Sequence, residues 1–532
     1  MRLFHSYLLF FIFSLPFIYW YIRKSGQFSD LFKVPRLISY LSLGYMFCTV
    51  ALYIWVPTYR EHIEPSITTI SLMIADGYPA YTQFDDSNVY SILYGPTTYL
   101  FQSEFLKLFS NPILGSKVYG ALCFVIGFAV LSYFLIRKYG ARYSLQGLFY
   151  FSIFVLLYYQ VAYRNQSDSI IFLGSSLAVV SLLSPSKWTS RLLLAFGVAL
   201  SVSAKFHAVG YVLPLLYFFY RQHGVKQLIV IGMASAALAL SPFLLETYSL
   251  SNFLTTMQTY SKLKLHYWLF LHNLSMAYVI FLPLLLLIYI DLRKKKIKPL
   301  LSNESFWTFL FTNAMVILVC LTAGIDGAGS YHIAPFAPVV AVLYTIYYSR
   351  HQDEFKQQFS SSGITYKTLL MTSIVAWCLA ISVFTASVQK KYIWFMQDHS
   401  SRAIETEVLL IKKEIEKNNW RVLMGYSDEE GYQKTFYRPL LWSSIKDNSL
   451  DPIAVMGRRM VGVDVPKTVE IRISERYYDV IIIPKPGEPF TMMNWHDVQQ
   501  PIFGDELPQL FKQYYSPLKE YEHFVLWQAK PT

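Results

Sequence analysis

Long stretches without charge constrain this chain more than any other feature of its sequence. Residues 37–56 contain no charged side chain, and similar apolar blocks recur as far as residue 388. A helix of roughly 17 to 22 apolar residues is long enough to cross the hydrocarbon of a bilayer. The chain is 54% hydrophobic and only 15% charged, unlike an ordinary soluble protein. The sequence therefore predicts a polytopic α-helical membrane protein.

We expect about eleven to thirteen transmembrane helices. The first block is flanked by basic residues and lacks a small-residue cleavage site, which favours an anchor over a removable signal peptide. The two short blocks around Lys205 form either a hairpin or the halves of a broken helix. The apolar blocks are 3–22, 37–56, 118–136, 145–162, 169–183, 192–204, 209–220, 228–244, 274–290, 306–321, 333–348 and 369–388.

The net charge of +12 is explained by membrane topology and requires no nucleic-acid partner. Lys and Arg gather in every second loop, at 23–36, 137–142, 221–226 and 291–298. Short loops rich in Lys and Arg stay in the cytoplasm. We therefore expect a multi-pass protein of the cell inner membrane or plasma membrane, with the loop 57–116 and the tail 389–532 on the extracytoplasmic side.

Two regions outside the membrane are long enough to fold. The first extracytoplasmic loop, 57–116, should pack on the membrane domain, which we assign to residues 1–388. The tail, 389–532, is expected to form a soluble α/β domain. Its pattern includes a helical stripe, strand-like runs at 422–425, 478–484 and 524–528, and a helix near 508–515. The stripe consists of Ile404, Val408, Ile411 and Ile415.

The first loop begins with YREHIEPS, residues 59–66, directly after an uncharged block. Pro65 suits the first position of a helix, and isoleucines follow it on one helical face. Asp76 and Gly77 supply a stop. The pattern predicts a short amphipathic interfacial helix with Glu64 as its N-cap, where the helix dipole favours an ionised carboxylate.

Ionisable residues cluster on the loops assigned to the outer side. Such residues are expensive near a membrane and are therefore functional candidates. Acids and cations from separate loops together suit an anionic headgroup and a general base. The candidates are Arg60, Glu61, His62 and Glu64; Asp85 and Asp86; Arg164 and Asp168; Lys205 and His207; and Asp326, Tyr331 and His332.

Each candidate also has a purely structural interpretation. Arg60 and Glu61 are typical of side chains that extend to the membrane surface, and Asp85 and Asp86 of turns. Asp168 suits a helix cap, and a histidine before a span can simply bond a carbonyl. Glu64 is the residue that the pattern favours most for function.

Several of these segments resemble those of one enzyme superfamily. An acid directly after an early span, a helix and a YGP segment, the polar YRNQSD stretch, the late GSYHIAPFAP stretch and an exported α/β tail occur together here. This combination is similar to the GT-C superfamily of integral membrane glycosyltransferases. The similar branch contains the protein mannosyltransferases, the lipid A aminoarabinose transferases and related bacterial enzymes.

The resemblance implies transfer of a sugar from a polyprenyl-phosphate donor to a hydroxyl of a lipid, glycan or protein acceptor. It suggests Glu64 as the catalytic base, with Glu61 one turn away as the competing acid. It further implies Asp168 as a second carboxylate, with Arg164, Lys205 and His332 as phosphate contacts. A divalent metal is possible in such enzymes. A polysaccharide polymerase or ligase and a multi-pass transporter of lipid-linked glycans remain alternatives.

Overall fold

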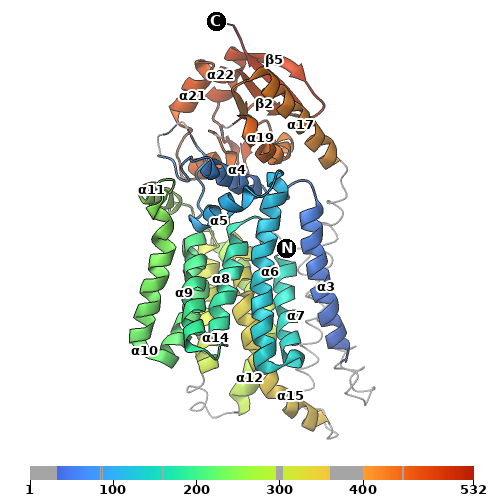
Figure 1. Ribbon diagram of the computed structural model, residues 1–532, viewed down its shortest axis with the longest axis vertical. Coiled ribbons are helices and arrows are strands. Elements are labelled where there is room, and N and C mark those ends of the chain that lie inside the picture. Colours follow the sequence, from blue (N-terminus) through green and yellow to red (C-terminus); the bar gives the residue numbers. More distant parts are fainter. Residues whose placement is uncertain are drawn as a thin grey trace.

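The protein consists of a bundle of long helices with a mixed α/β domain at one end (Figure 1). The computed structural model describes residues 33–83, 86, 88–158, 161–294, 304–359, 400–445 and 449–531. The predicted blocks 3–22 and 369–388 lie outside these residues. Each of the other ten predicted blocks contains helix, which confirms the polytopic helical fold in the described part of the chain.

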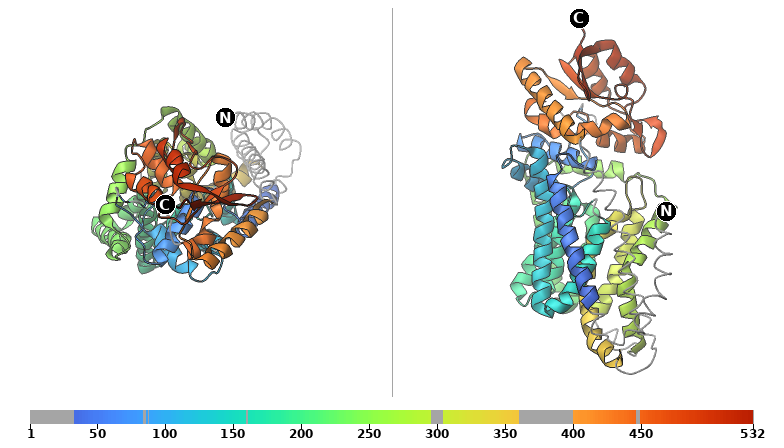
Figure 2. Two further views of the ribbon diagram at one scale, coloured as in Figure 1. Left: turned by 90° about the horizontal axis from the view of Figure 1, so that it is seen from above. Right: turned by 90° about the vertical axis from the view of Figure 1, so that its right-hand side faces the viewer.

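Long apolar helices run side by side in the bundle, as two directions of view agree (Figures 1 and 2). Five helical segments of the described residues are long and apolar enough to cross a membrane: Pro112–Tyr139, Phe206–Leu244, Tyr267–Tyr289, Glu304–Thr322 and Ser330–Arg350. The bundle helices are α3 (Lys33–Trp55), α6 (Pro112–Tyr139), α7 (Ala141–Leu157), α8 (Ser167–Ser181), α9 (Lys187–Ala204), α10 (Val209–Leu240), α12 (Tyr267–Lys294), α14 (Glu304–Thr322) and α15 (Ala337–Phe359), with short 3-10 turns η1 (Phe206–Ala208), η2 (Ser241–Leu244) and η3 (Ser330–Phe336).

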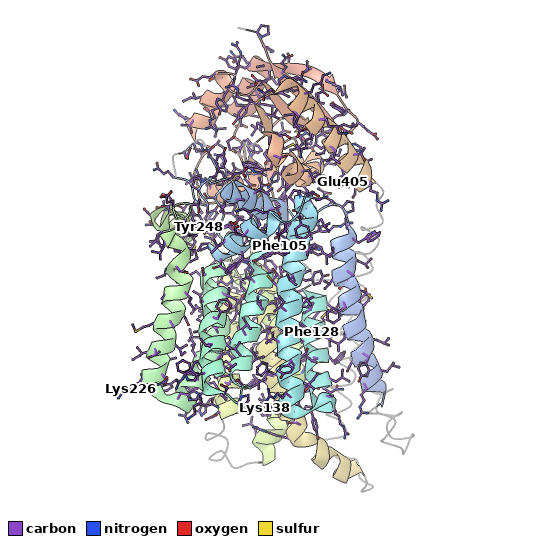
Figure 3. The ribbon with its side chains drawn as sticks, in the orientation of Figure 1. Phe105, Phe128, Lys138, Lys226, Tyr248 and Glu405 are labelled. Carbon is purple, nitrogen blue, oxygen red and sulfur yellow. The ribbon has the colours of Figure 1, made fainter. Side chains whose placement is uncertain are left out.

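Helix α10 contains the two predicted blocks 209–220 and 228–244. Gly224 separates them with φ 79° and ψ 173°, a left-handed conformation that glycine adopts readily. Lys226 lies at the end of the bundle far from the tail, as does Lys138, whereas Tyr248 lies near the tail (Figure 3). The two halves of α10 therefore form an antiparallel pair joined by a tight turn.

The first loop forms a layer between the bundle and the tail (Figure 1). It contains α4 (Ile63–Ala75) and α5 (Thr97–Leu106), and α11 (Leu250–Tyr260) lies at the same level. The predicted stop is confirmed, because α4 ends before Asp76 and Gly77 has φ 89°.

The predicted start of α4 is wrong. The N-cap is His62, and Glu64 lies inside the first turn. Proline is tolerated there as well as at the first position, because the first N–H groups of a helix have no partner within the helix. The helix is also buried on more than one face, so it does not have the single apolar face expected of a helix resting on a membrane.

The tail is the predicted α/β domain. A four-stranded sheet has the order β1-β2-β6-β5, in which β1 and β2 are parallel and the other pairs antiparallel, and β3 and β4 form a separate hairpin. The predicted stripe lies buried on α17. The elements are α17 (Ser400–Asn418), β1 (Val422–Met424), α18 (Glu429–Tyr432), η4 (Gln433–Tyr437), α19 (Arg438–Ile445), α20 (Pro452–Met460), α21 (Lys467–Ser474), β2 (Val480–Pro484), β3 (Met493–Asn494), β4 (Asp497–Pro501), α22 (Glu506–Tyr514), β5 (Tyr515–Glu520) and β6 (Phe524–Ala529).

The first loop and the tail share one hydrophobic core. Ile67 and Ile70 of α4 belong to the same buried cluster as Val480 of β2, while the bundle has a cluster of its own. Backbone bonds reinforce the contact, since the N–H of Asp451 donates to the carbonyl of Val89 at 2.8 Å. The first loop therefore packs against the tail as well as against the bundle.

A buried ion pair crosses this interface. Arg438 Nη2 lies 2.6 Å from both Asp451 Oδ2 and the hydroxyl of Ser66 on α4, and neither ionic side chain is more than 1% exposed. The carboxylate of Asp451 also accepts the N–H groups of Ile453 and Ala454. These hydrogen bonds fix the positions of the two charged groups and link the tail to α4.

We expect Arg438→Met to loosen the tail from α4. It would leave the Asp451 carboxylate buried without its cation, which costs about 3–5 kcal/mol. Thermal unfolding and limited proteolysis in nanodiscs would measure the effect. Arg421→Met is the control, because its ion pair with Asp479 is exposed and such pairs contribute about 0–1 kcal/mol. Equal stability of the two variants would contradict the prediction.

Candidate functional site

The two acids of the first loop lie in different environments. Glu64 is fully buried, whereas the side chain of Glu61 is 21% exposed. A carboxylate that takes a proton from a substrate must reach that substrate. On accessibility, Glu61 is the better candidate for a base.

Glu64 joins three segments of the chain. Its Oε2 accepts the backbone N–H groups of Arg60 at 3.1 Å and of Glu61 at 3.2 Å, and its Oε1 accepts the hydroxyl of Tyr53 on α3. The Tyr53 hydroxyl in turn accepts the N–H of Asn165 at 2.9 Å. The carboxylate therefore fixes the backbone that carries Glu61.

Glu61 is held by neighbours that favour its ionised form. Its Oε2 accepts the N–H of Ile63 at 2.9 Å and the side-chain amide of Gln166 at 3.1 Å, and its Oε1 lies 2.5 Å from His62 Nδ1. Burial alone would raise the pKa of Glu61, but His62, the Ile63 N–H and the charge of Arg164 together lower it. Glu61 is thus a partly accessible, charged acid.

A second carboxylate lies deeper and is paired. Lys205, at the C-terminal end of α9, donates to Asp168 Oδ2 at 2.9 Å, and its Nζ lies 4.9 Å from the centre of the Tyr94 ring. Burial, first, and the charges of Asp168 and Glu61 raise the pKa of Tyr94. The amide of Gln166, the N-cap of α8, donates to Glu61 Oε2 at 3.1 Å, and Asp168 follows two residues later in the first turn of α8, so the two acids lie close together.

Three polar atoms around this pair are buried and have no hydrogen-bond partner within the described part of the chain. They are Asp168 Oδ1, His207 Nε2 and His332 Nδ1. The rings of His207 and His332 are 4.8 Å apart. Buried polar atoms normally have partners, so a polar ligand is a candidate partner for this cluster, which we call the cluster around Lys205.

The rim of the site includes residues that sequence reasoning missed. His266 Nε2 lies 2.7 Å from Asp326 Oδ1. Burial, first, and the charges of His62 and His266 lower the pKa of His496 in the tail, while Asp326 opposes this shift. His266 and His496 are not adjacent in sequence to any predicted site residue, so only the folded chain reveals them.

The structure brings most of the predicted residues together. Glu61 contacts His62, Asp168 contacts Lys205, and the ring of His332 lies between those of Tyr331 and His207. Asp326 contacts His266, and Arg164 lies close enough to Glu61 to affect its pKa. Asp86 has a turn role, since its Oδ1 accepts the N–H of Asn88 at 3.1 Å. Asp85 lies outside the described residues. Arg60 contributes its backbone N–H to Glu64.

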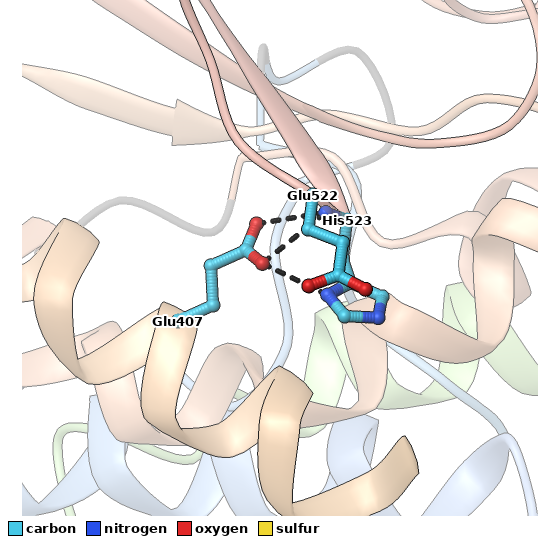
Figure 4. Close-up of side chains that lie close together, drawn as sticks. All are labelled: Glu407, Glu522 and His523. Atoms are coloured by element: carbon cyan, nitrogen blue, oxygen red, sulfur yellow. Dashed lines mark hydrogen bonds and ion pairs between the residues drawn. The ribbon is translucent and has the colours of Figure 1, made fainter.

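A group of side chains with metal-ligating atoms lies elsewhere, in the tail (Figure 4). Ligand atoms of Glu407, Glu522 and His523 are within 4.8 Å of one another. Glu407 already accepts the backbone N–H groups of His523 and Phe524, and its Oε2 lies 2.8 Å from His523 Nδ1. These contacts attach the turn between β5 and β6 to α17. The group is therefore separate from the candidate site.

We expect Glu64→Gln to destabilise the protein. The amide retains one oxygen for the N–H groups of Arg60 and Glu61, but its NH₂ group cannot accept the Tyr53 hydroxyl. A buried donor without an acceptor costs about 1–3 kcal/mol. Thermal unfolding in nanodiscs measures the loss. Glu104→Gln should be neutral, because the pair with Lys107 is exposed; a Glu64→Gln variant as stable as this control would refute the structural role.

Comparison with known proteins shows similarity at the level of the overall structure. No family model and no curated protein sequence matches the chain. The crystal structure of ArnT from Cupriavidus metallidurans bound to undecaprenyl phosphate is similar, with a TM-score of 0.51 and 12% identity over 93% of this chain and 99% of that chain. This similarity confirms the fold that the sequence resemblance implied.

Two further structures are more distant. ArnT from the same organism in the apo state has a TM-score of 0.49 and 11% identity over 92% of this chain and 99% of that chain. Arabinosyltransferase EmbB from Mycobacterium smegmatis has a TM-score of 0.37 and 13% identity over 59% of this chain and 30% of that chain.

Proposed function

Since the chain has the fold of the GT-C membrane glycosyltransferases, we propose that it transfers a sugar from a polyprenyl-phosphate carrier to an acceptor hydroxyl. The structural neighbour ArnT binds undecaprenyl phosphate, which supports a lipid-linked donor here. The single observation that carries the proposal is local. One partly exposed carboxylate, Glu61, accepts the amide of Gln166 next to Asp168, whose partner Lys205 lies in a cluster of buried polar side chains.

Glu61 is the proposed base. It takes the proton of the acceptor hydroxyl as the acceptor oxygen bonds to the anomeric carbon and the bond from that carbon to the phosphate oxygen breaks. Glu64, which the sequence favoured for this role, is assigned to positioning, because it is fully buried and its oxygens accept hydrogen bonds from Tyr53 and from the amides of Arg60 and Glu61.

The leaving phosphate is assigned to the cluster around Lys205. As the bond breaks, the phosphate gains negative charge, and preorganised cations and donors stabilise that charge most where water is excluded. Lys205 and the nitrogens of His207 and His332 that lack partners among the described residues are proposed to contact the phosphate, and Arg164, whose charge acts on Glu61, adds positive charge nearby. Asp168 orients Lys205 through their 2.9 Å contact.

The lipid-linked donor would enter from the membrane, with its acceptor on the side of the tail. Basic residues such as Lys138 and Lys226 lie at the opposite end of the bundle (Figure 3), and short basic loops remain in the cytoplasm. We therefore assign the tail and the site to the extracytoplasmic face of the cell inner membrane or plasma membrane.

The topology is tested with a reporter that is active only outside the cytoplasm. Fusion to the C-terminus should give activity, because the tail lies opposite the basic end of the bundle. Fusion after Gly224, in the turn of α10, should give none. Both fusions must be expressed at similar levels, as judged by immunoblot. An active reporter at Gly224 would reverse the assignment.

The base is tested with purified protein and polyprenyl-phosphate-linked sugars. Mass analysis of lipids and glycans from a deletion strain identifies the substrates first. Glu61→Gln should then lower turnover by about 10²–10⁴-fold, the scale of general-base catalysis, with thermal stability close to the parent. Glu104→Gln is the matched control. Near-normal turnover in Glu61→Gln would remove this residue from the chemistry.

A further inference from the structure

A hairpin of the tail ends beside the candidate base. Strands β3 and β4 pair Asn494 with Asp497, so Trp495 and His496 form the turn between them. The Oδ1 of Asn494 accepts the N–H of His496 at 3.0 Å, and its amide donates to Gln500 Oε1 at 2.8 Å. These bonds hold the turn, which we call the hairpin tip (Trp495 and His496), in one conformation.

The base of the hairpin is anchored in the tail. Met492 and Ile502, which flank it, are fully buried, and the N–H of Ile502 donates to the carbonyl of Met492 at 3.0 Å. The ring of Trp495 packs on Tyr432, with 5.5 Å between ring centroids. The tip is therefore a rigid extension of the tail domain.

The tip touches two segments of the site. The ring of Trp495 lies 4.7 Å from that of His62, which contacts Glu61. His496 Nε2 lies 3.8 Å from the point where a Cβ on Gly327 would stand, next to Asp326. Tail residues thus form part of the surroundings of Glu61 and Asp326.

The tip also retains free surface. Trp495 is only partly buried, and His496 is exposed. A tryptophan offers a large, flat apolar face that suits the C–H face of a pyranose ring, and a neighbouring imidazole can bond its hydroxyl groups. A few polar groups beside an aromatic surface are typical of small-ligand sites.

We propose that the hairpin tip binds the acceptor, and that the acceptor is a saccharide. Trp495 stacks on its ring and His496 bonds a hydroxyl, so that the neighbouring hydroxyl faces Glu61. The inference rests on the proposed function for the identity of the reaction. The phosphate of the donor is already assigned to the cluster around Lys205, so the tip, which contacts His62 from the tail, is assigned to the acceptor.

Saccharide binding is tested independently of transfer. The full-length protein in nanodiscs is titrated with methyl pyranosides of glucose, galactose, mannose and N-acetylglucosamine, with saturation-transfer NMR as the readout. We expect signal from at least one pyranoside, lost in Trp495→Ala and retained in Trp495→Phe. Trp527→Ala and His523→Ala, elsewhere in the tail, are the controls and should bind as the parent does.

Kinetics then separates positioning from stability. With a bound pyranoside as acceptor, Trp495→Ala should raise the acceptor KM by about tenfold, the value of one aromatic contact, and Trp495→Phe should restore most of this loss, which a merely destabilised protein would not show. A pyranoside signal equal in parent and Trp495→Ala, or none in the parent, would overturn the inference. A parent that binds pyranosides without using any polyprenyl donor would instead overturn the proposed function and leave the tip assignment supported.

Discussion

The carboxylate of Glu64 is the constraint on which the rest of the site depends. It lies fully buried and accepts hydrogen bonds from Tyr53 of α3 and from the amides of Arg60 and Glu61. Asn165 extends the network, since its amide bonds Thr68 of α4 at 2.7 Å. A buried charge is tolerated only where hydrogen bonds replace its water. The turn that presents Glu61 is therefore set by packing of the bundle and first loop.

The tail is also coupled to the turn that presents Glu61, because the first loop and the tail share one hydrophobic core. Because α4 is packed between bundle and tail, and Arg438 bonds both Asp451 and Ser66, the tail cannot shift without moving the layer that carries Glu61. The tail domain is therefore part of the structure that holds the site in place.

The sequence predicted what depends on composition and local pattern. Uncharged blocks indicated the bundle, Asp76 and Gly77 indicated the end of α4, and strand-like runs indicated three of the four strands in the tail sheet. It misplaced the start of α4, because Pro65 is compatible with several positions in a first turn. It could not reveal the partners of Glu61, since Gln166 and the tip at Trp495 reach the first loop only through tertiary packing.

The proposed transfer leaves the net charge of the site unchanged. Before reaction, Glu61 and Asp168 oppose Lys205 and Arg164, and the histidines can donate hydrogen bonds without adding charge if neutral. When a glycosyl phosphodiester loses its sugar, the remaining phosphate monoester gains one negative charge. Glu61 loses one at the same step by taking the acceptor proton. The net charge of a poorly solvated site is therefore unchanged, which avoids the large cost of creating charge at low dielectric. This balance requires the base and the phosphate-binding groups to lie close together, and the contacts of Gln166 with Glu61 and of Asp168 with Lys205, both at the start of α8, meet that requirement.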